Sequence, residues 1–268
     1  MHSDSFFTGC RAHNVCQDYA RAGKTPSGRV YAIVSDGCSS SPDTDFGARL
    51  LTAAAVFSIN QFTSIKPEWT IWEASRCRPP YIPVTCLDAT LFAAFDNPGG
   101  WIDVTGFGDG VVVARRRDGR VDAWSVGFDN NAPAYLSYLL STARLKTYTD
   151  GGYGGRIITL WEDGVPSGPV TPQDDVEFAW GLTIDPKEYD LVMVLSDGVH
   201  SFLTDPAKGT PMSVHFLEVV NHLLDIKTFT GEFMVRRAKR FMHNTCQEKG
   251  WHNSDDFSVA AIYLGENP

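Results

Sequence analysis

Residues 30–37 read VYAIVSDG, and residues 191–198 read LVMVLSDG. Each segment is a continuous apolar run that ends in Ser-Asp-Gly, a pattern typical of a fully buried strand followed by a turn. An aspartate at the end of a buried strand is held rigidly and points toward solvent. We therefore expect Asp36 and Asp197 to lie at sheet edges, where other acidic groups can gather around them.

The patterns around these segments alternate between strand and helix. Apolar runs predict further strands at residues 5–9, 88–95, 101–107, 111–116, 121–126, 157–161, 177–182 and 257–264. Apolar spacings of three and four predict helices from Phe46 onward and at 67–77, 214–222 and 231–247. Asp118-Gly119 predicts a tight hairpin. Residues 127–156 are rich in Gly and Tyr, and we expect a functional loop or flap there.

These elements together predict an α+β fold in which antiparallel sheets are covered by helices. No linker, repeat or low-complexity stretch divides residues 1–268, so we expect a single domain. The formal net charge of -9 argues against a nucleic-acid partner. No apolar run is long enough to predict a membrane span. The 6 cysteines are scattered and no export signal precedes them, so we expect free thiols and a cytoplasmic protein.

Three of these cysteine and histidine positions are evenly spaced. Cys10, His13 and Cys16 follow one another at intervals of three residues, so a zinc site is conceivable. A fourth ligand is not apparent, and structural zinc sites usually contain paired Cys-x-x-Cys ligands. The simpler interpretation is a strand and loop with small buried thiols.

The aspartates carry the strongest chemical signal. Asp18 lies in a predicted loop, and Asp255-Asp256 comes directly before the last predicted strand. Carboxylates that cluster repel one another and need cations, and oxygen ligands suit Mg²⁺ or Mn²⁺. A single Asp-Gly pair is more simply a turn. Two buried strands that end in the same tripeptide make a divalent-metal site the better interpretation.

Six short segments, in order along the chain, resemble the metal-dependent protein phosphatases of the 2C type. They are residues 9–18 (GCRAHNVCQD), 34–48 (VSDGCSSSPDTDFGA), 86–95 (CLDATLFAAF), 106–112 (GFGDGVV), 194–202 (VLSDGVHSF) and 254–262 (SDDFSVAAI). The resemblance implies a four-layer αββα sandwich, with two antiparallel sheets packed face to face and flanked by helices. It also implies a cleft at one sheet edge that holds two or three Mn²⁺ or Mg²⁺ ions.

The resemblance assigns roles to the acidic residues. Asp18 should contact one metal directly or through water, and Asp36 should bridge two metals with the Gly37 carbonyl on one of them. Asp197 and Asp255 should bind the other metal. Asp109 should help Asp255 to hold a weaker third ion, while Asp256 should stand behind the ligands.

The implied activity is hydrolysis of phosphomonoesters, with a metal-bridging hydroxide as the nucleophile and phosphorylated serine or threonine proteins as substrates. A cognate protein kinase is an implied partner.

Two positions depart from the family pattern. His13, with Arg11 nearby, stands where many members have a phosphate-binding arginine, and Cys38 stands where many have a histidine that protonates the leaving group.

Two alternatives remain open at this point. His200 is a candidate substitute acid near the leaving group, although a capping or surface histidine is the simpler interpretation. The departures at His13 and Cys38 also leave room for a catalytically weak pseudophosphatase that binds phosphoproteins, whereas the intact aspartates favour an enzyme.

Overall fold

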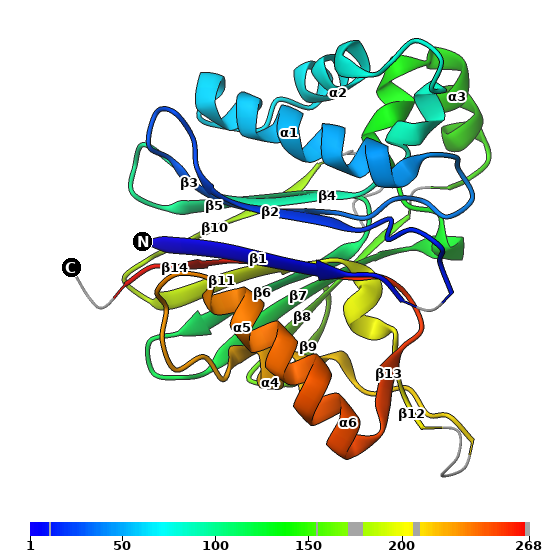
Figure 1. Cartoon of the computed structure of the whole chain (residues 1–268). Coiled ribbons are helices and arrows are strands. Elements are labelled where there is room, and N and C mark those ends of the chain that lie inside the picture. The colour runs from blue at the N-terminus through cyan, green and yellow to red at the C-terminus, as the bar shows by residue number, and fades with distance from the viewer. Residues whose placement is uncertain (11, 154, 171–178, 206–209, 266–268) are drawn as a thin grey trace.

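Two antiparallel sheets pack face to face, and helices cover the outer face of each sheet (Figure 1). The computed structural model describes residues 1–10, 12–153, 155–170, 179–205 and 210–265. This four-layer αββα arrangement confirms the α+β fold expected from the sequence.

The larger sheet has seven strands within the described residues. In spatial order they are β1 (His2–Thr8), β14 (Phe257–Tyr263), β11 (Tyr189–Leu195), β6 (Gly110–Arg116), β7 (Val121–Phe128), β8 (Arg156–Glu162) and β9 (Val165–Val170). The smaller sheet contains β10 (Trp180–Ile184), β5 (Ile102–Phe107), β4 (Leu91–Asp96), β3 (Val30–Ser35) and β2 (Tyr19–Lys24). A short ribbon pairs β12 (Phe202–Thr204) with β13 (Trp251–Asn253).

The helices form the two outer layers. The smaller sheet is covered by α1 (Thr44–Phe62) and α2 (Pro67–Cys77), and the larger sheet by α4 (Phe216–Leu224), α5 (Phe233–Arg240) and α6 (Cys246–Lys249) (Figure 1). A further helix, α3 (Thr142–Asp150), lies near α2 (Figure 1). Single helical turns are η1 (Val84–Leu87), η2 (Asp129–Asn131), η3 (Leu136–Leu140), η4 (Asp197–His200) and the π-helical η6 (Phe241–Thr245).

The burial of β3 explains why its sequence is apolar throughout. Val34 packs into the core between the two sheets, whereas Ile33 packs into the core beneath α1. β11 behaves in the same way, since Val194 faces the core between the sheets and Met193 faces the helix layer. Strands covered on both faces lose the polar alternation of a half-exposed strand, so they appear as continuous apolar runs.

Several local predictions need correction. The 127–156 segment is not merely a loop, because it contains η2, η3 and α3. The helix expected at 231–247 is divided by the π-helical turn η6. The predictions omitted β2, β9, β12 and β13, and part of the strand expected at 177–182 lies outside the described residues.

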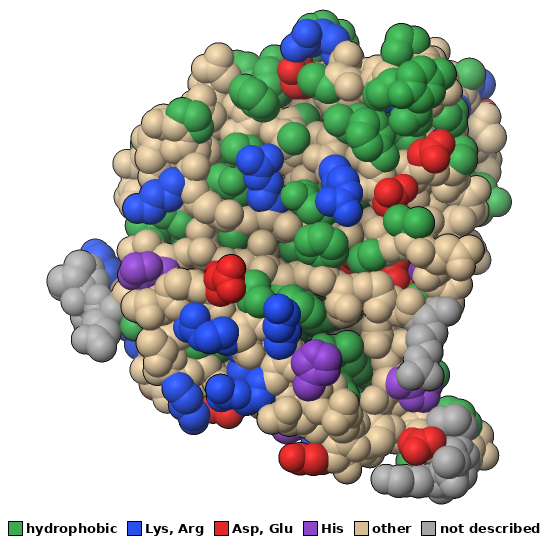
Figure 2. Space-filling view, viewed as in Figure 1, with side chains coloured by type: hydrophobic (Ala, Val, Ile, Leu, Met, Phe, Trp, Pro, Cys, Tyr) green, Lys and Arg blue, Asp and Glu red, His purple; other side chains and the backbone are tan. Residues whose placement is uncertain are grey.

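Two surface properties bear on partners. None of the helices in the described ranges is long and apolar enough to cross a membrane. Lys and Arg side chains gather over the lower helix layer (Figure 2), where α5 carries Arg236, Lys239 and Arg240. The consecutive Arg115 and Arg116 pair with Asp190 and Asp122 respectively, so they stabilise the larger sheet.

Candidate active site

Strand register brings the predicted aspartates to one end of the sandwich, opposite the end at which β1 begins (Figure 1). Tyr19 of β2 pairs with Ser35 of β3, which places the neighbouring Asp18 beside Asp36. In the larger sheet, Leu195 pairs with Val111, so Asp197 follows β11 where Asp109 precedes β6. Asp109 lies on the connection between β5 and β6, which passes from one sheet to the other.

The carboxyl groups of this cluster interact directly. Asp36 is within hydrogen-bonding range of both Asp18 and Asp197, so it occupies the centre. Burial raises the pKa of Asp36 well above its usual range, and the charges of Asp18 and Asp197 raise it further. Burial also raises the pKa of Asp197, and the charge of Asp255 raises it further.

Burial also perturbs the acids on either side. It raises the pKa of Asp18 to about 7, although a hydrogen bond from Ser196 Oγ to Asp18 Oδ2 (2.6 Å) acts in the opposite direction. Burial raises the pKa of Asp109 to about 7, and the charge of Asp197 adds to the shift. Several acids that resist ionisation at one place are a sign of a functional site.

One buried atom tests whether a cation fits this site. Asp18 Oδ1 is buried and has no hydrogen-bond partner within the part of the chain that the structure describes. Its carboxyl neighbour is Asp36, which has no proton to donate when it is ionised. Two facing carboxylates need either a shared proton or a cation between them. The all-oxygen donor set suits Mg²⁺ or Mn²⁺.

The glycines after the aspartates have a packing role. A Cβ atom on Gly37 would lie 2.7 Å from the Thr44 side chain at the start of α1. A Cβ atom on Gly198 would lie 1.8 Å from the Asp256 carbonyl oxygen. Only glycine lets the backbone pass this close, so both Ser-Asp-Gly turns pack tightly against their neighbours.

Asp256 anchors the loop that carries Asp18. It is 2% exposed and accepts hydrogen bonds from the backbone N–H groups of Cys10 and Gln17, each at 2.7 Å. His13 Nδ1 lies 3.0 Å from its Oδ2. Burial alone would raise the pKa of Asp256, but these hydrogen bonds outweigh it and lower the pKa below 3.8. Asp256 therefore positions the loop from behind the predicted ligands.

Of the two predicted phosphate contacts, His13 and Arg11, only His13 belongs to the described residues. His13 lies between two carboxylates, with Nδ1 also 3.7 Å from Asp255 Oδ1. Its role as a phosphate contact stays a prediction. Arg11 lies outside the described residues.

Cys38 is held close to the cluster by the start of α1 and by Asp88. Its backbone N–H donates to the Asp88 carbonyl oxygen (2.8 Å), and its Sγ lies 3.1 Å from Ser40 Oγ. Tyr135, which the sequence did not single out, interacts with Cys38, and the charges of Asp109 and Asp36 also act on its phenol. Burial raises the pKa of Tyr135, so its phenol stays protonated.

His200 ends η4, the helical turn that Asp197 begins. Its ring packs against Phe216 of α4 with 4.7 Å between ring centroids, and Nε2 is 3.4 Å from Ser125 Oγ. Phe216 belongs to the core on the helix side of the larger sheet. Desolvation of the ring lowers the pKa of His200. These contacts fit the simpler interpretation of His200 better than a role at the leaving group.

The chain thus folds as a two-sheet sandwich with a cluster of acidic side chains at one edge. A sequence profile described as "Protein phosphatase 2C" matches residues 10–228. The chain belongs to the protein phosphatase 2C family.

Solved structures share the fold at low sequence identity. A variant of a bacterial serine phosphatase has a TM-score of 0.57 and 10% identity, covering 100% of this chain and 99% of that one. The serine/threonine phosphatase Stp1 from Staphylococcus aureus has a TM-score of 0.54 and 9% identity, covering 99% and 96%. A SpoIIE fragment from Bacillus subtilis contains the phosphatase domain and part of the regulatory domain. It has a TM-score of 0.53 and 12% identity, and the match covers 98% of this chain and 62% of that one. No curated protein sequence matches this chain.

Proposed function

We propose that this protein is a metal-dependent phosphomonoester hydrolase that acts on phosphoserine and phosphothreonine in proteins. The observation that carries the proposal is the chain of carboxyl contacts from Asp18 through Asp36 to Asp197, with a buried oxygen of Asp18 left without a donor. Carboxylates this close together, partly withdrawn from water, repel one another unless cations compensate their charges.

The roles of the residues follow from their places. When bound, divalent cations at this cluster neutralise phosphate oxygens and lower the pKa of water so that hydroxide is available at neutral pH. Asp36 lies at the centre and would contact ions on both sides. Ser196 orients Asp18, while Asp109 and Asp255 flank Asp197 and suit a further, weaker ion. The Gly37 carbonyl is a further proposed ligand.

The leaving group needs a proton or a hydrogen bond as the ester bond breaks. Cys38 and Tyr135 are the proposed groups on this side of the cluster, because they contact each other and Tyr135 senses both Asp36 and Asp109. A protonated phenol can donate a hydrogen bond to the departing oxygen. The chain's own nucleophilic side chains would not be required, because bound cations would supply hydroxide as the nucleophile.

A substrate that carries phosphoserine or phosphothreonine implies a protein kinase that acts on the same protein. We also propose a cytoplasmic location, where the free thiols of this chain would stay reduced.

The deciding experiment is hydrolysis of p-nitrophenyl phosphate and of a phosphothreonine peptide by the purified chain with Mn²⁺. We expect turnover of both, lost in chelator and lost in the Asp36→Asn variant. Turnover that persists in chelator would contradict the metal-dependent reaction. Binding of the peptide without turnover, at saturating Mn²⁺, would favour the phosphoprotein-binding alternative instead.

A further inference from the structure

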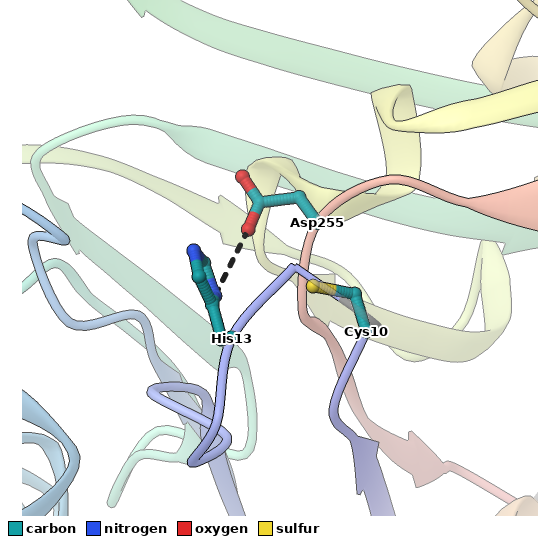
Figure 3. Close-up of side chains that lie close together, drawn as sticks. All are labelled: Cys10, His13 and Asp255. Carbon is teal, nitrogen blue, oxygen red and sulfur yellow. Dashed lines mark ion pairs between the residues drawn. The ribbon is translucent and has the colours of Figure 1, made fainter.

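Three side chains of the types that can bind transition metals meet beside the acidic cluster. One ligand atom each from Cys10, His13 and Asp255 lies within 4.8 Å of the other two (Figure 3). Cys10 and His13 come from the loop after β1, and Asp255 comes from the loop before β14. Cys10 and His13 are half-buried, and the Asp255 side chain is 49% exposed, so an ion can reach the group from solvent.

The surrounding structure holds these side chains in place. β1 pairs with β14 up to Thr8 and Phe257, so the loops that carry the three residues leave adjacent strand ends. Asp256 accepts hydrogen bonds from the Cys10 backbone and from His13 Nδ1. The Ala12 N–H donates to Cys10 Sγ (3.3 Å), which fixes the direction of the sulfur. A carboxylate that orients a histidine is a common support for metal-binding histidines.

The donor set is selective for one class of cation. Mg²⁺ and Mn²⁺ prefer oxygen, whereas a sulfur, an imidazole nitrogen and a carboxylate oxygen together suit Zn²⁺, with water as a fourth ligand. Ligand atoms around tetrahedral zinc are roughly 3.5 Å apart, given bonds of about 2.0–2.3 Å. Small side-chain rotations would therefore close the three donors around one ion. Cys16 is not part of this group, since its Sγ donates to the Asp18 carbonyl oxygen (3.4 Å).

We propose that Cys10, His13 and Asp255 form a zinc site that competes with the catalytic metal centre for Asp255. Zinc bound there withdraws Asp255 from the neighbourhood of Asp197, with which it interacts electrostatically. The inhibitory consequence rests on the proposed phosphatase function, whereas zinc binding itself does not. The chain then contains a switch in which zinc lowers phosphatase activity by removing one carboxylate from the Mn²⁺ site.

Cobalt spectroscopy of the full-length chain tests the site without any activity assay. Co²⁺ alone should produce a near-ultraviolet band from sulfur-to-metal charge transfer, and Zn²⁺ should abolish it by displacement. The band should be lost in Cys10→Ser and kept in Cys77→Ser, whose thiol is exposed at the end of α2. Absence of the band in the wild type, or its survival in Cys10→Ser, would overturn the site.

A second measurement on the unmodified protein covers the case in which Cys10→Ser fails to fold. Zn²⁺ should slow alkylation of Cys10 by iodoacetamide, read by peptide mass mapping, and leave alkylation of Cys77 unchanged. Equal rates for Cys10 with and without zinc would refute the site.

The inhibitory switch is tested by phosphatase activity. The Zn²⁺ concentration that half-inhibits Mn²⁺-supported hydrolysis should rise at least about tenfold in His13→Gln. An unchanged value overturns the switch. A cobalt band in a chain without phosphatase activity would refute the proposed function and leave the site standing.

Discussion

Replacement of Asp256 by alanine should loosen the loop that carries Asp18. The carboxylate is buried and accepts two backbone hydrogen bonds at 2.7 Å, from Cys10 and Gln17, as well as one from His13. Hydrogen bonds to a charged group contribute about 1.5–3 kcal/mol each, and the two N–H groups would lose their partner. We therefore expect the free energy of unfolding to fall by about 4 kcal/mol.

The assay is urea denaturation followed by tryptophan fluorescence, with chelator present so that metal binding does not contribute. With a slope of about 3 kcal/mol/M, the midpoint should fall by more than about 1 M. Asp118→Ala is the matched control, because its carboxylate pairs with Arg120 in an exposed turn, and exposed pairs contribute little. A loss below about 1 kcal/mol in the Asp256 variant, or equal losses in both variants, would refute the anchoring role.

The pH dependence gives an independent check. The folded pKa of Asp256 is lower than its ordinary value of 3.8, so its contribution to stability is complete above that value. The contribution is lost as the pH falls through the folded pKa, where the carboxyl becomes protonated. The stability difference between wild type and Asp256→Ala should therefore stay constant near neutrality and shrink below about pH 3.8. A difference that is unchanged in strong acid would contradict this account.

Four further variants test the metal site and the leaving group. Asp36→Asn should reduce kcat at least about a hundredfold, because the central ligand supports ions on both sides; activity within tenfold of wild type would contradict its place. Asp109→Ala should leave the tight Mn²⁺ sites intact in calorimetric titration and weaken only a further site, so loss of the tight sites would be the opposing result. Cys38→His should raise kcat for alkyl phosphates and change kcat for aryl phosphates little, so the slope of log kcat against leaving-group pKa should become shallower. An unchanged slope would show that position 38 does not lie near the leaving oxygen. Tyr135→Phe should lower kcat for alkyl phosphates more than for aryl phosphates, and an equal loss for both would indicate a packing role alone.

The strands that position the site were predictable because their burial leaves a local signature. β3 and β11 are covered on both faces, so their sequences are apolar throughout and end at Asp36 and Asp197. The helix α2 was likewise predicted with its observed bounds, since Pro67 starts it and Ile71 and Ala74 lie on its buried face. Local patterns of this kind need no knowledge of distant contacts.

Other parts of the site depend on contacts between residues far apart in the chain. β2, YARAGK, has few apolar residues, and it forms because it pairs with β3 at the sheet edge. Tyr135 precedes a single helical turn, and only tertiary packing brings it to Cys38. Cys10 and Asp255 likewise lie close together because β1 pairs with β14, and no local sequence pattern predicts that pairing.

The most direct test of the metal site is diffraction from crystals grown with Mn²⁺, measured at the manganese absorption edge. We expect anomalous peaks on both sides of Asp36, with Asp197 bound to one of the ions and Asp18 beside the other. Anomalous peaks only at other surfaces of the protein, with the Asp36 carboxylate free of manganese at saturating Mn²⁺, would contradict it.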